Sequence, residues 1–476
     1  MSHNAGSPSA IPRKRVSLLS ILTRALDALR AQSAFPSVAI AYSGGLDSAA
    51  LLHAAAAYCR EHDVKLFAFH VHHGLSANAD MWLANCSART EALGASFDAR
   101  RVTVTPSGSG VEATARTARY AALGEMCRAH GVPLLLTAHH LDDQAETVLL
   151  QLLRGSGPAG LSGMDASNRA ASLLGDPDTL IARPLLDVTR AELEAYVRQN
   201  DIEFVTDESN DDPRFARNAL RLKVMPVLAE AFPGYQQRFA RAASHAQSAQ
   251  RLLTEMGEQD LAACLVDDAV DCVKLRALSE DRASNMLRHW FHVRGLSMPS
   301  TAWLSEMLVQ AREAGYATQM LVTHPECLVR RHRDRLYITP KLAPLAAERE
   351  PDDDYIPPGQ PFQWSGEGSI AFPAYGGTLH IEPAEEGIDP AWLREQKLEI
   401  SFRKGGERVK PAHNRPSRGL KYHYQALDIP AWERGRLPIV HAGIQLLFAA
   451  GIGMDYHKMT AHPGVVFRWE SASHKL

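Results

Sequence analysis

The stretch Ser43-Gly44-Gly45-Leu46-Asp47-Ser48 is the most informative in this chain, because it joins a predicted strand to a predicted helix. The strand is the short apolar run at residues 38–41, and the helix is an Ala- and Leu-rich run over about 48–60. The glycines let the backbone approach an anion closely, the serines add hydroxyl donors, and the first helical turn offers N–H groups with positive partial charge. Asp47 fits beside an anion only if it holds a cation such as Mg²⁺ or orients a polar group. The stretch therefore predicts a phosphate-binding loop.

Two commoner phosphate-binding motifs are excluded. A Walker loop needs Gly-Lys followed by Ser or Thr, and Gly-Lys occurs nowhere in this chain. Residues 155–160 match the dinucleotide pattern G-x-G-x-x-G, but they follow a predicted helix rather than a strand. We interpret them as a turn that ends this helix.

Strand and helix signals alternate through the first half of the chain. Further strands are expected at residues 66–69, 101–104 and 133–137, with helices at 79–93, 112–130 and 143–153. Thr189 and Glu192 form a capping box that opens a helix ending at Gln199, and residues 164–179 predict a surface loop. Mostly apolar strands between helices are typical of a doubly wound α/β fold with a parallel sheet.

The rest of the chain changes character twice. Helical spacing prevails over about 228–335, and short apolar runs with glycines and aromatics predict a small β-rich domain near the end. Repeated prolines around Asp352-Asp353-Asp354 indicate a linker. The expected organisation is an N-terminal extension and helix at 1–35, a catalytic domain at 36–227, a mostly helical middle domain at 228–340, a linker at 341–361 and a C-terminal domain at 362–476.

The composition is that of a soluble globular protein, with 45% hydrophobic and 22% charged residues among 476. Its six cysteines include no Cys-x-x-Cys pair, which fits a reduced compartment where thiols act as small core residues. Near the N-terminus, Arg24 and Asp27 interrupt an apolar run at helical spacing, which favours an amphipathic helix over a signal peptide. No membrane segment is visible, so we expect a cytoplasmic protein.

The net charge of −3 is unevenly distributed. Residues 389–476 carry 14 basic and 8 acidic side chains, a net charge of +6, and the preceding part carries −9. This separation is typical of a module that faces a polyanion such as RNA, and the interleaved aromatic and histidine rings offer stacking groups. The rings are Phe402, His413, Tyr422, His423 and Tyr424, and the basic residues are Arg403, Lys404, Arg408, Lys410, Arg415, Arg418 and Lys421.

Polar clusters follow three of the predicted elements. Residues 70–75 (His-Val-His-His-Gly-Leu) follow the second strand, residues 112–116 open a helix, and residues 138–147 (Ala-His-His-Leu-Asp-Asp-Gln-Ala-Glu-Thr) follow the fourth strand. Because the carboxyl ends of parallel strands face the ligand crevice, these groups are candidates for a shared site. Neither Cys partners nor a His-x-x-x-His spacing supports zinc.

The phosphate loop resembles that of the N-type ATP pyrophosphatases, the PP-loop superfamily. The full set of motifs is similar to the tRNA(Ile)-lysidine synthetase family over about residues 36–230. Besides the loop, the set comprises His72 to Leu75, Glu112 to Arg116, His139 to Thr147, Leu153 to Gly155 with Gly157, Arg183 to Leu186, Asp207 to Asn210 and Arg217 to Arg221. The middle and C-terminal parts resemble the family more weakly.

This resemblance implies an ATP-dependent carbon–nitrogen ligase. The family adenylates the C2 oxygen of the wobble cytidine, position 34, in the isoleucine tRNA with a CAU anticodon, releasing diphosphate. The ε-amine of free L-lysine then attacks C2 and expels AMP, giving lysidine. The change switches codon reading from AUG to AUA and charging from methionine to isoleucine. The C-terminal end of the family is thought to grip the acceptor stem, and the catalytic domain the anticodon loop.

The resemblance also implies roles for particular residues. Ser43 to Ser48 and His139 would bind ATP, and Asp47, Arg116, Asp142 and Asp143 would be catalytic. Asp47 and Asp143 are the Mg²⁺ candidates. Candidates for lysine or tRNA binding are Glu146, Arg217 and the basic residues Arg403, Lys404, Arg408, Lys410, Arg415, Arg418 and Lys421. The cofactors are then ATP and Mg²⁺, and the partners lysine and this tRNA, without a membrane or a protein partner.

Three alternatives remain open from the residues. Thiolation of tRNA on the same fold is one, although thiolating relatives often carry cysteine pairs. Glutamine-dependent amidation would need a glutaminase domain with a reactive cysteine, and none precedes Ser43. A non-enzymatic RNA-binding protein with a relict ATP site is disfavoured by the intact loop and its neighbouring carboxylates.

Overall fold

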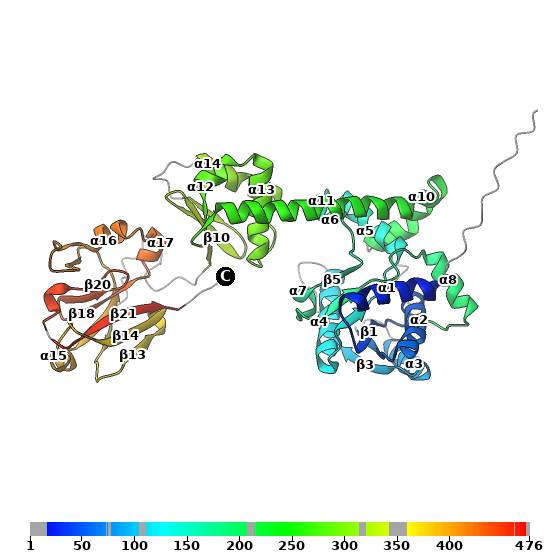
Figure 1. The fold of residues 1–476 in the computed structure, drawn as a ribbon, viewed down its shortest axis with the longest axis horizontal. Helices are drawn as coiled ribbons and strands as arrows, with labels where there is room; N and C mark the ends of the chain where they lie inside the picture. The colour runs from blue at the N-terminus through cyan, green and yellow to red at the C-terminus, as the bar shows by residue number, and fades with distance from the viewer. Residues whose placement is uncertain are drawn as a thin grey trace, which may run out of the picture. The chain divides into compact units, whose positions relative to one another are not determined.

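The computed structural model describes residues 17–72, 74, 78–103, 111–206, 214, 216–313, 320–341, 359–460 and 462–472, without the side chains of 111–113. The chain divides into two compact units, residues 1–253 and 254–476. Figure 1 shows the helices and strands along the chain. Most of the predicted linker, residues 342–358, lies outside the described residues. Each unit is described by itself.

The first unit is built on a six-stranded sheet with the strand order β3-β2-β1-β4-β6-β5. Neighbouring strands are parallel, except that β5 runs antiparallel to β6 at the edge. This confirms the predicted doubly wound α/β fold. The strands are β1 Ser37–Ala41, β2 Lys65–His72, β3 Ser96–Arg101, β4 Leu134–Leu136, β5 Ser167–Arg169 and β6 Leu180–Ala182.

Helices cover both faces of this sheet (Figure 1). Helices α1, α2 and α8 share one hydrophobic core with the strands, whereas α4 and α7 close the opposite face. The predicted amphipathic N-terminal helix is α1, and the predicted capping box opens α8. The helices are α1 Leu18–Gln32, α2 Leu46–His62, α3 Ala79–Ala92, α4 Val111–His130, α5 Leu141–Leu153, α6 Pro158–Leu161, α7 Ala171–Leu174, α8 Arg190–Gln199, α9 Ala216–Ala219, the π-helical turn η2 Leu220–Val224, α10 Met225–Ala231 and α11 Tyr235–Cys264, which continues into the second unit.

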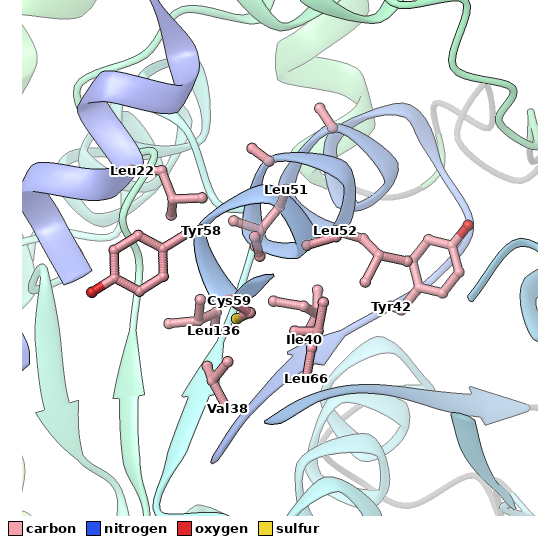
Figure 2. Packing of buried hydrophobic residues seen from close by; sticks show 14 of the residues in the cluster. Leu22, Val38, Ile40, Tyr42, Leu51, Leu52, Tyr58, Cys59, Leu66 and Leu136 are labelled. Atoms are coloured by element: carbon pink, nitrogen blue, oxygen red, sulfur yellow. The ribbon is translucent and has the colours of Figure 1, made fainter. Parts of the chain in front are cut away.

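The alternation of side chains along β1 explains the two cores. Val38 and Ile40 face the core beneath α2, and Ala39 faces the core beneath α4, each with no exposed surface. Figure 2 shows Leu51 and Leu52 of α2 over this strand. Each fully buried leucine contributes about 2 kcal/mol by removal of apolar surface from water. This packing fixes the strand and the helix that flank the glycine-rich loop.

The strand order places a topological switch point between β1 and β4. From β1 the chain proceeds outward to β2 and β3, and then returns to add β4 on the other side of β1. At such a point the loops after two adjacent strands separate and leave a crevice. The loop from Ser43 to Gly45 and the segment from Thr137 to His140 both begin there.

Two local predictions for the first unit are wrong. The third strand is Ser96–Arg101 rather than 101–104. It is an edge strand whose side chains are partly exposed, so it has no apolar run to mark it. Residues 164–179 are not only loop, since they contain β5 and the short helix α7. Leu174 of α7 is fully buried, a tertiary contact without a periodic signal.

The first part of the second unit is mostly helical, as expected, but it also contains an antiparallel sheet that the sequence did not predict. The sheet has the order β7-β8-β11-β10-β9 and packs on a core that includes Trp290 and Phe291. Its strands are short or alternate with charged residues, as Arg330 does in β10. The elements are β7 Leu265–Val266, β8 Ala269–Asp271, α12 Cys272–Ala277, α13 Glu280–Val293, α14 Thr301–Glu313, β9 Leu321–Thr323, β10 Cys327–His332 and β11 Arg335–Pro340.

The C-terminal part is β-rich, as predicted. Its sheets have the orders β12-β15-β18-β19-β20, β13-β14-β21 and β16-β17. Strand β14 pairs along its whole length with β21, so residues before 389 share a core with those after it. The elements are β12 Gln360–Phe362, β13 Ser369–Phe372, η3 Pro373–Tyr375, β14 Gly377–Ala384, α15 Pro390–Glu395, β15 Leu398–Phe402, β16 Arg408–Val409, β17 Arg418–Gly419, α16 Leu420–Ala426, α17 Ala431–Arg434, β18 Pro438–Ala442, β19 Gln445–Ala449, β20 Gly453–Met454, η4 Tyr456–Lys458 and β21 Gly464–Ser471.

All six cysteines are buried and free, which confirms their expected place in the cores. Within the described part of the chain, no helix is both long and apolar enough to cross a membrane.

Candidate active site

The glycine-rich loop leaves β1 and enters α2 in a conformation that requires glycine. Gly44 has a φ of +83°, and a Cβ at this position would lie 2.8 Å from the Sγ of Cys86. The hydroxyls of Ser43 and Ser48 lie 3.0 Å apart, and the Ser48 hydroxyl donates to the Gly45 carbonyl at 3.0 Å. The N-cap of α2 is Gly45, which has no side chain to cap the first turn, so the N–H groups of this turn can donate to an anion.

Asp47 lies in this first turn and is held from one side. Its Oδ2 accepts a hydrogen bond from Nη1 of Arg190 at 2.8 Å, and its Oδ1 lies 3.8 Å from Nε2 of His140. Among the described residues, no group donates a hydrogen bond to this buried Oδ1. Burial raises the pKa of Asp47, although the charges of His140 and Arg190 oppose it. Within the described part of the site, this carboxylate oxygen therefore has an unused acceptor position.

The acidic motif after β4 forms the start of α5. His140 is the N-cap, its backbone N–H donates to Asp143 Oδ2 at 3.1 Å, and Asp143 N–H donates to the His140 ring at 3.4 Å. Asp142 Oδ2 accepts from the backbone N–H of Arg190 at 2.8 Å, and its Oδ1 accepts from Gln236 at 3.1 Å. Three helix N-termini, those of α2, α5 and α8, therefore converge on Asp47 and Asp142.

Two arginines neutralise the acidic side of the site. Glu146, only 3% exposed, accepts from Arg217 Nε at 2.8 Å and from Arg221 Nε and Nη2 at 2.8 and 2.9 Å. The same guanidinium groups reach Asp143 Oδ1 at 2.9 and 3.3 Å. Burial acts to raise the pKa of Asp143, but the charges of His140 and Arg217 and the hydrogen bond from the His140 N–H outweigh it, so the pKa is lowered. We refer to Asp143, Glu146, Arg217 and Arg221 as the carboxylate–arginine cluster.

His139 follows β4, Arg183 follows β6, and the charge of Arg116 on α4 acts on both side chains. The ring Nδ1 of His139 is 2.8 Å from the Thr137 hydroxyl, and burial is the main cause that lowers the pKa of His139 to about 3. Its imidazole is therefore neutral at physiological pH. Arg116 lies over the ring of Tyr120, with its Cζ 4.9 Å from the ring centre. Arg183 is buried and donates to the Asp165 carbonyl at 2.8 Å.

The structure thus brings together the predicted residues of the catalytic domain. It adds Arg190 and Arg221, for which the sequence analysis named no role. Arg190 follows the Thr189 N-cap directly, and Arg221 lies four residues after Arg217. These positions in the sequence could have marked both arginines as candidate site residues. His73, Leu75 and the motif at 207–210 lie outside the described residues, as does the side chain of Glu112.

The predicted basic residues belong to the second unit, in the C-terminal domain. Lys404, Arg408, Arg415, Arg418 and Lys421 are exposed, and Arg403 and Lys410 are half-buried. Among the interleaved rings, some are exposed and others are buried in the core. Tyr422 is 49% exposed beneath the Arg418 guanidinium, whose Cζ is 4.2 Å from the ring centre.

Phe402 and Tyr424 are buried in hydrophobic cores, so their prediction as stacking groups is wrong. The alternation of β15 turns Phe402 inward, and the Tyr424 hydroxyl donates to the Ala450 carbonyl at 3.0 Å.

The glycine-rich loop, placed at the switch point of a parallel sheet and lacking a Walker lysine, is that of a PP-loop ATP pyrophosphatase, and residues 18–228 match the PP-loop domain family. Residues 271–337 match the TilS substrate binding domain, and residues 398–469 match the TilS substrate C-terminal domain. The tRNA(Ile)-lysidine synthases of Burkholderia pseudomallei and Ralstonia nicotianae are both 42% identical to this chain; the first match covers 88% of this chain and 89% of the relative, the second 91% and 92%. The chain belongs to the tRNA(Ile)-lysidine synthase family.

Proposed function

We propose that this protein joins L-lysine to C2 of the wobble cytidine in the isoleucine tRNA with a CAU anticodon. ATP adenylates the C2 oxygen and releases diphosphate, and the lysine ε-amine then attacks C2 and expels AMP. The observation that supports this mechanism is the placement of an anion loop, from Ser43 to Ser48, beside acidic groups at the start of α5. The glycine-rich loop suits phosphates, and the acidic groups beside it suit a cationic amine.

For ATP, we assign the phosphates to the loop and the first turn of α2, where glycine backbone and serine hydroxyls donate. Arg116 has no carboxylate partner among the described residues, and we assign it to phosphate charge. The neutral ring of His139 lines the nucleotide side. We propose that the reaction takes place in the cytoplasm, where ATP and tRNA are present.

Magnesium would neutralise phosphate charge when it arrives with ATP. Asp47 fits this ion, because its Oδ1 is buried and accepts no hydrogen bond from a described residue. Asp143 fits less well, because both of its oxygens already accept hydrogen bonds. No group of three potential metal ligands occurs among the described residues, so the phosphates would supply most of the coordination.

For lysine, we assign the acidic start of α5. Lysine arrives as an ammonium, and Asp142 or Asp143 is placed to bind that ammonium. The ammonium must lose a proton before the amine attacks C2, because only the neutral amine is a nucleophile. Glu146 and Asp143 are neutralised by Arg217 and Arg221, so an ammonium that enters here has to exchange with a guanidinium. A displaced arginine would then be free to meet phosphate charge on ATP or tRNA.

Thiolation is the alternative on the same fold, and the burial of the cysteines disfavours it. All six are buried, and burial raises the pKa of Cys86, which lies beneath the loop, to about 11. A thiolate is the reactive form, and such a pKa leaves almost none at neutral pH.

The proposal is tested by the stoichiometry of the products. Incubation with ATP, lysine and the isoleucine tRNA should give one AMP and one diphosphate for each lysine incorporated. ADP and inorganic phosphate instead would contradict cleavage between the α and β phosphates. Diphosphate release that proceeds equally without tRNA would contradict adenylation of a tRNA base.

Neutralising basic residues of the C-terminal domain should weaken tRNA binding and leave ATP binding unchanged. The triple variant Lys404→Gln, Arg418→Gln and Lys421→Gln removes three exposed charges. For each phosphate contact that is lost, the plot of log K for tRNA binding against log salt concentration becomes less steep, its slope changing by about 0.9. We expect tRNA affinity to fall about tenfold or more at low salt. Titrations at several salt concentrations measure both quantities.

The matched control neutralises Arg60, Lys65 and Arg198, which are exposed as well. They lie at the end of α2, the start of β2 and the end of α8. This is the side of the sheet opposite the carboxyl ends of the strands, where the loop lies. Equal affinity in the two triple variants would mean that the charges of the C-terminal domain are merely solvated.

A further inference from the structure

Arg190 links the two chemical halves of the site. It is the first residue of α8, and its Nη1 donates to Asp47 Oδ2 at 2.8 Å. Its backbone N–H donates to Asp142 Oδ2, also at 2.8 Å. One residue therefore touches both the carboxylate of the phosphate loop and a carboxylate of the acidic motif, which lie 143 and 48 positions away in the sequence.

The start of α8 is itself fixed. Thr189 and Glu192 form a reciprocal capping box, with the Thr189 N–H donating to Glu192 Oε2 at 2.8 Å. The Leu141 N–H donates to the Val188 carbonyl at 2.9 Å, so the segment before α8 is bound to the first residue of α5. Because Arg190 projects from this anchored turn, its position relative to α5 is set by backbone hydrogen bonds.

The pair with Asp47 differs from an ordinary surface ion pair. Arg190 also approaches Glu194 at 3.3 Å, but that partner is 40% exposed and four residues along the same helix, a geometry of small effect. The Asp47 side chain is 27% exposed, and its other oxygen accepts no hydrogen bond from a described residue. Loss of Arg190 would leave the Asp47 carboxylate free to rotate.

We propose that Arg190 is a positioning residue for the adenylation step: its guanidinium holds Asp47 by Oδ2 and leaves Oδ1 without a hydrogen bond from a described residue, while its N–H holds Asp142 at the start of α5. This inference rests on the proposed function, and it gives Arg190 a role that acts through Asp47 rather than through direct contact with ATP. The role predicts a loss in turnover without an equal loss in ATP affinity, because misplacing a catalytic group slows the reaction of bound substrate.

The test compares Arg190→Ala, Arg190→Lys and the control Arg198→Ala, which removes an exposed arginine from the same helix. Diphosphate release gives kcat and KM, direct titration gives the Kd for ATP, and thermal melting reports the fold. We expect kcat of Arg190→Ala to fall roughly 10- to 100-fold, with the Kd for ATP within about threefold of wild type. Both variants keep the backbone N–H that Asp142 accepts, and Arg190→Lys also keeps the positive charge beside Asp47. Arg190→Lys should therefore recover part of kcat even if the alanine variant proves unstable.

A double-mutant cycle with Asp47→Asn decides whether Arg190 acts through Asp47. We expect the double variant to be no more than about threefold slower than Asp47→Asn alone. Effects that multiply in full would overturn the inference, as would a fall in ATP affinity that matches the fall in kcat. If the wild-type protein releases diphosphate normally and Arg190→Ala has an unchanged kcat, the inference is overturned and the proposed function stands. A wild-type protein that releases no diphosphate would overturn the proposed function, and this inference with it.

Discussion

Replacing Asp47 with alanine is expected to lower diphosphate release by at least about 10²-fold while the protein stays folded. The carboxylate lies in the first turn of α2 beside the phosphate loop, paired with Arg190, and its Oδ1 accepts no hydrogen bond from a described residue. The variant therefore removes a charge from the place where phosphate and Mg²⁺ are expected, not an apolar side chain from the core. Asp47→Asn, which keeps the volume, should lose a similar amount.

The fold should tolerate both variants because Asp47 contributes little to native stability. Its pKa is raised by burial, so the ionised form is less favourable in the folded chain than in the unfolded chain at neutral pH. Removing the charge should leave the melting temperature unchanged or slightly higher. Glu61→Gln, an exposed carboxylate at the other end of α2, is the matched control and should retain full activity. Full tRNA modification by Asp47→Ala would refute the assignment of the loop.

The phosphate loop could be predicted from the sequence because its chemistry is local. The positive φ at Gly44 and the uncapped start of α2 both follow from adjacent residues. The convergence with the acidic motif also followed, since parallel strands deliver their carboxyl ends to the same edge. Asp142 and Asp143 accordingly lie at the start of α5, beside the loop.

The partners of these carboxylates could not be predicted, because they depend on tertiary packing. Arg190 reaches Asp47 only because α8 packs beside α2, and Arg217 and Arg221 reach Glu146 from a short helix and a π-helical turn. Tertiary packing also determines whether an aromatic ring is exposed, where it can stack on RNA, or buried in a core. Tyr422 and Tyr424 are two residues apart on α16, yet one is 49% exposed and the other fully buried.

The second prediction of large effect concerns the choice of tRNA. The isoleucine tRNA with a CAU anticodon should be modified at least roughly 10²-fold faster than the methionine tRNAs that share this anticodon. The catalytic site alone cannot distinguish these tRNAs, because both present the same cytidine at the same position of the anticodon. We propose that the C-terminal domain, with net +6 over residues 389–476 and exposed groups such as Arg418 over Tyr422, supplies a second contact with the tRNA outside the anticodon. Discrimination then arises from transition-state binding that draws on both contacts.

The most direct measurement is the nucleoside composition of each tRNA after incubation with the protein, ATP and radiolabelled lysine. Methionine tRNA is the matched control, because it presents the same anticodon, and omission of ATP shows whether the label depends on adenylation. The account predicts that position 34 of the isoleucine tRNA becomes lysidine and carries the label, while the cytidine of the methionine tRNA is unchanged. Equal label in both tRNAs would contradict the two-contact specificity. An unlabelled cytidine in the isoleucine tRNA, with sulfur or ammonia accepted in place of lysine, would contradict the reaction itself.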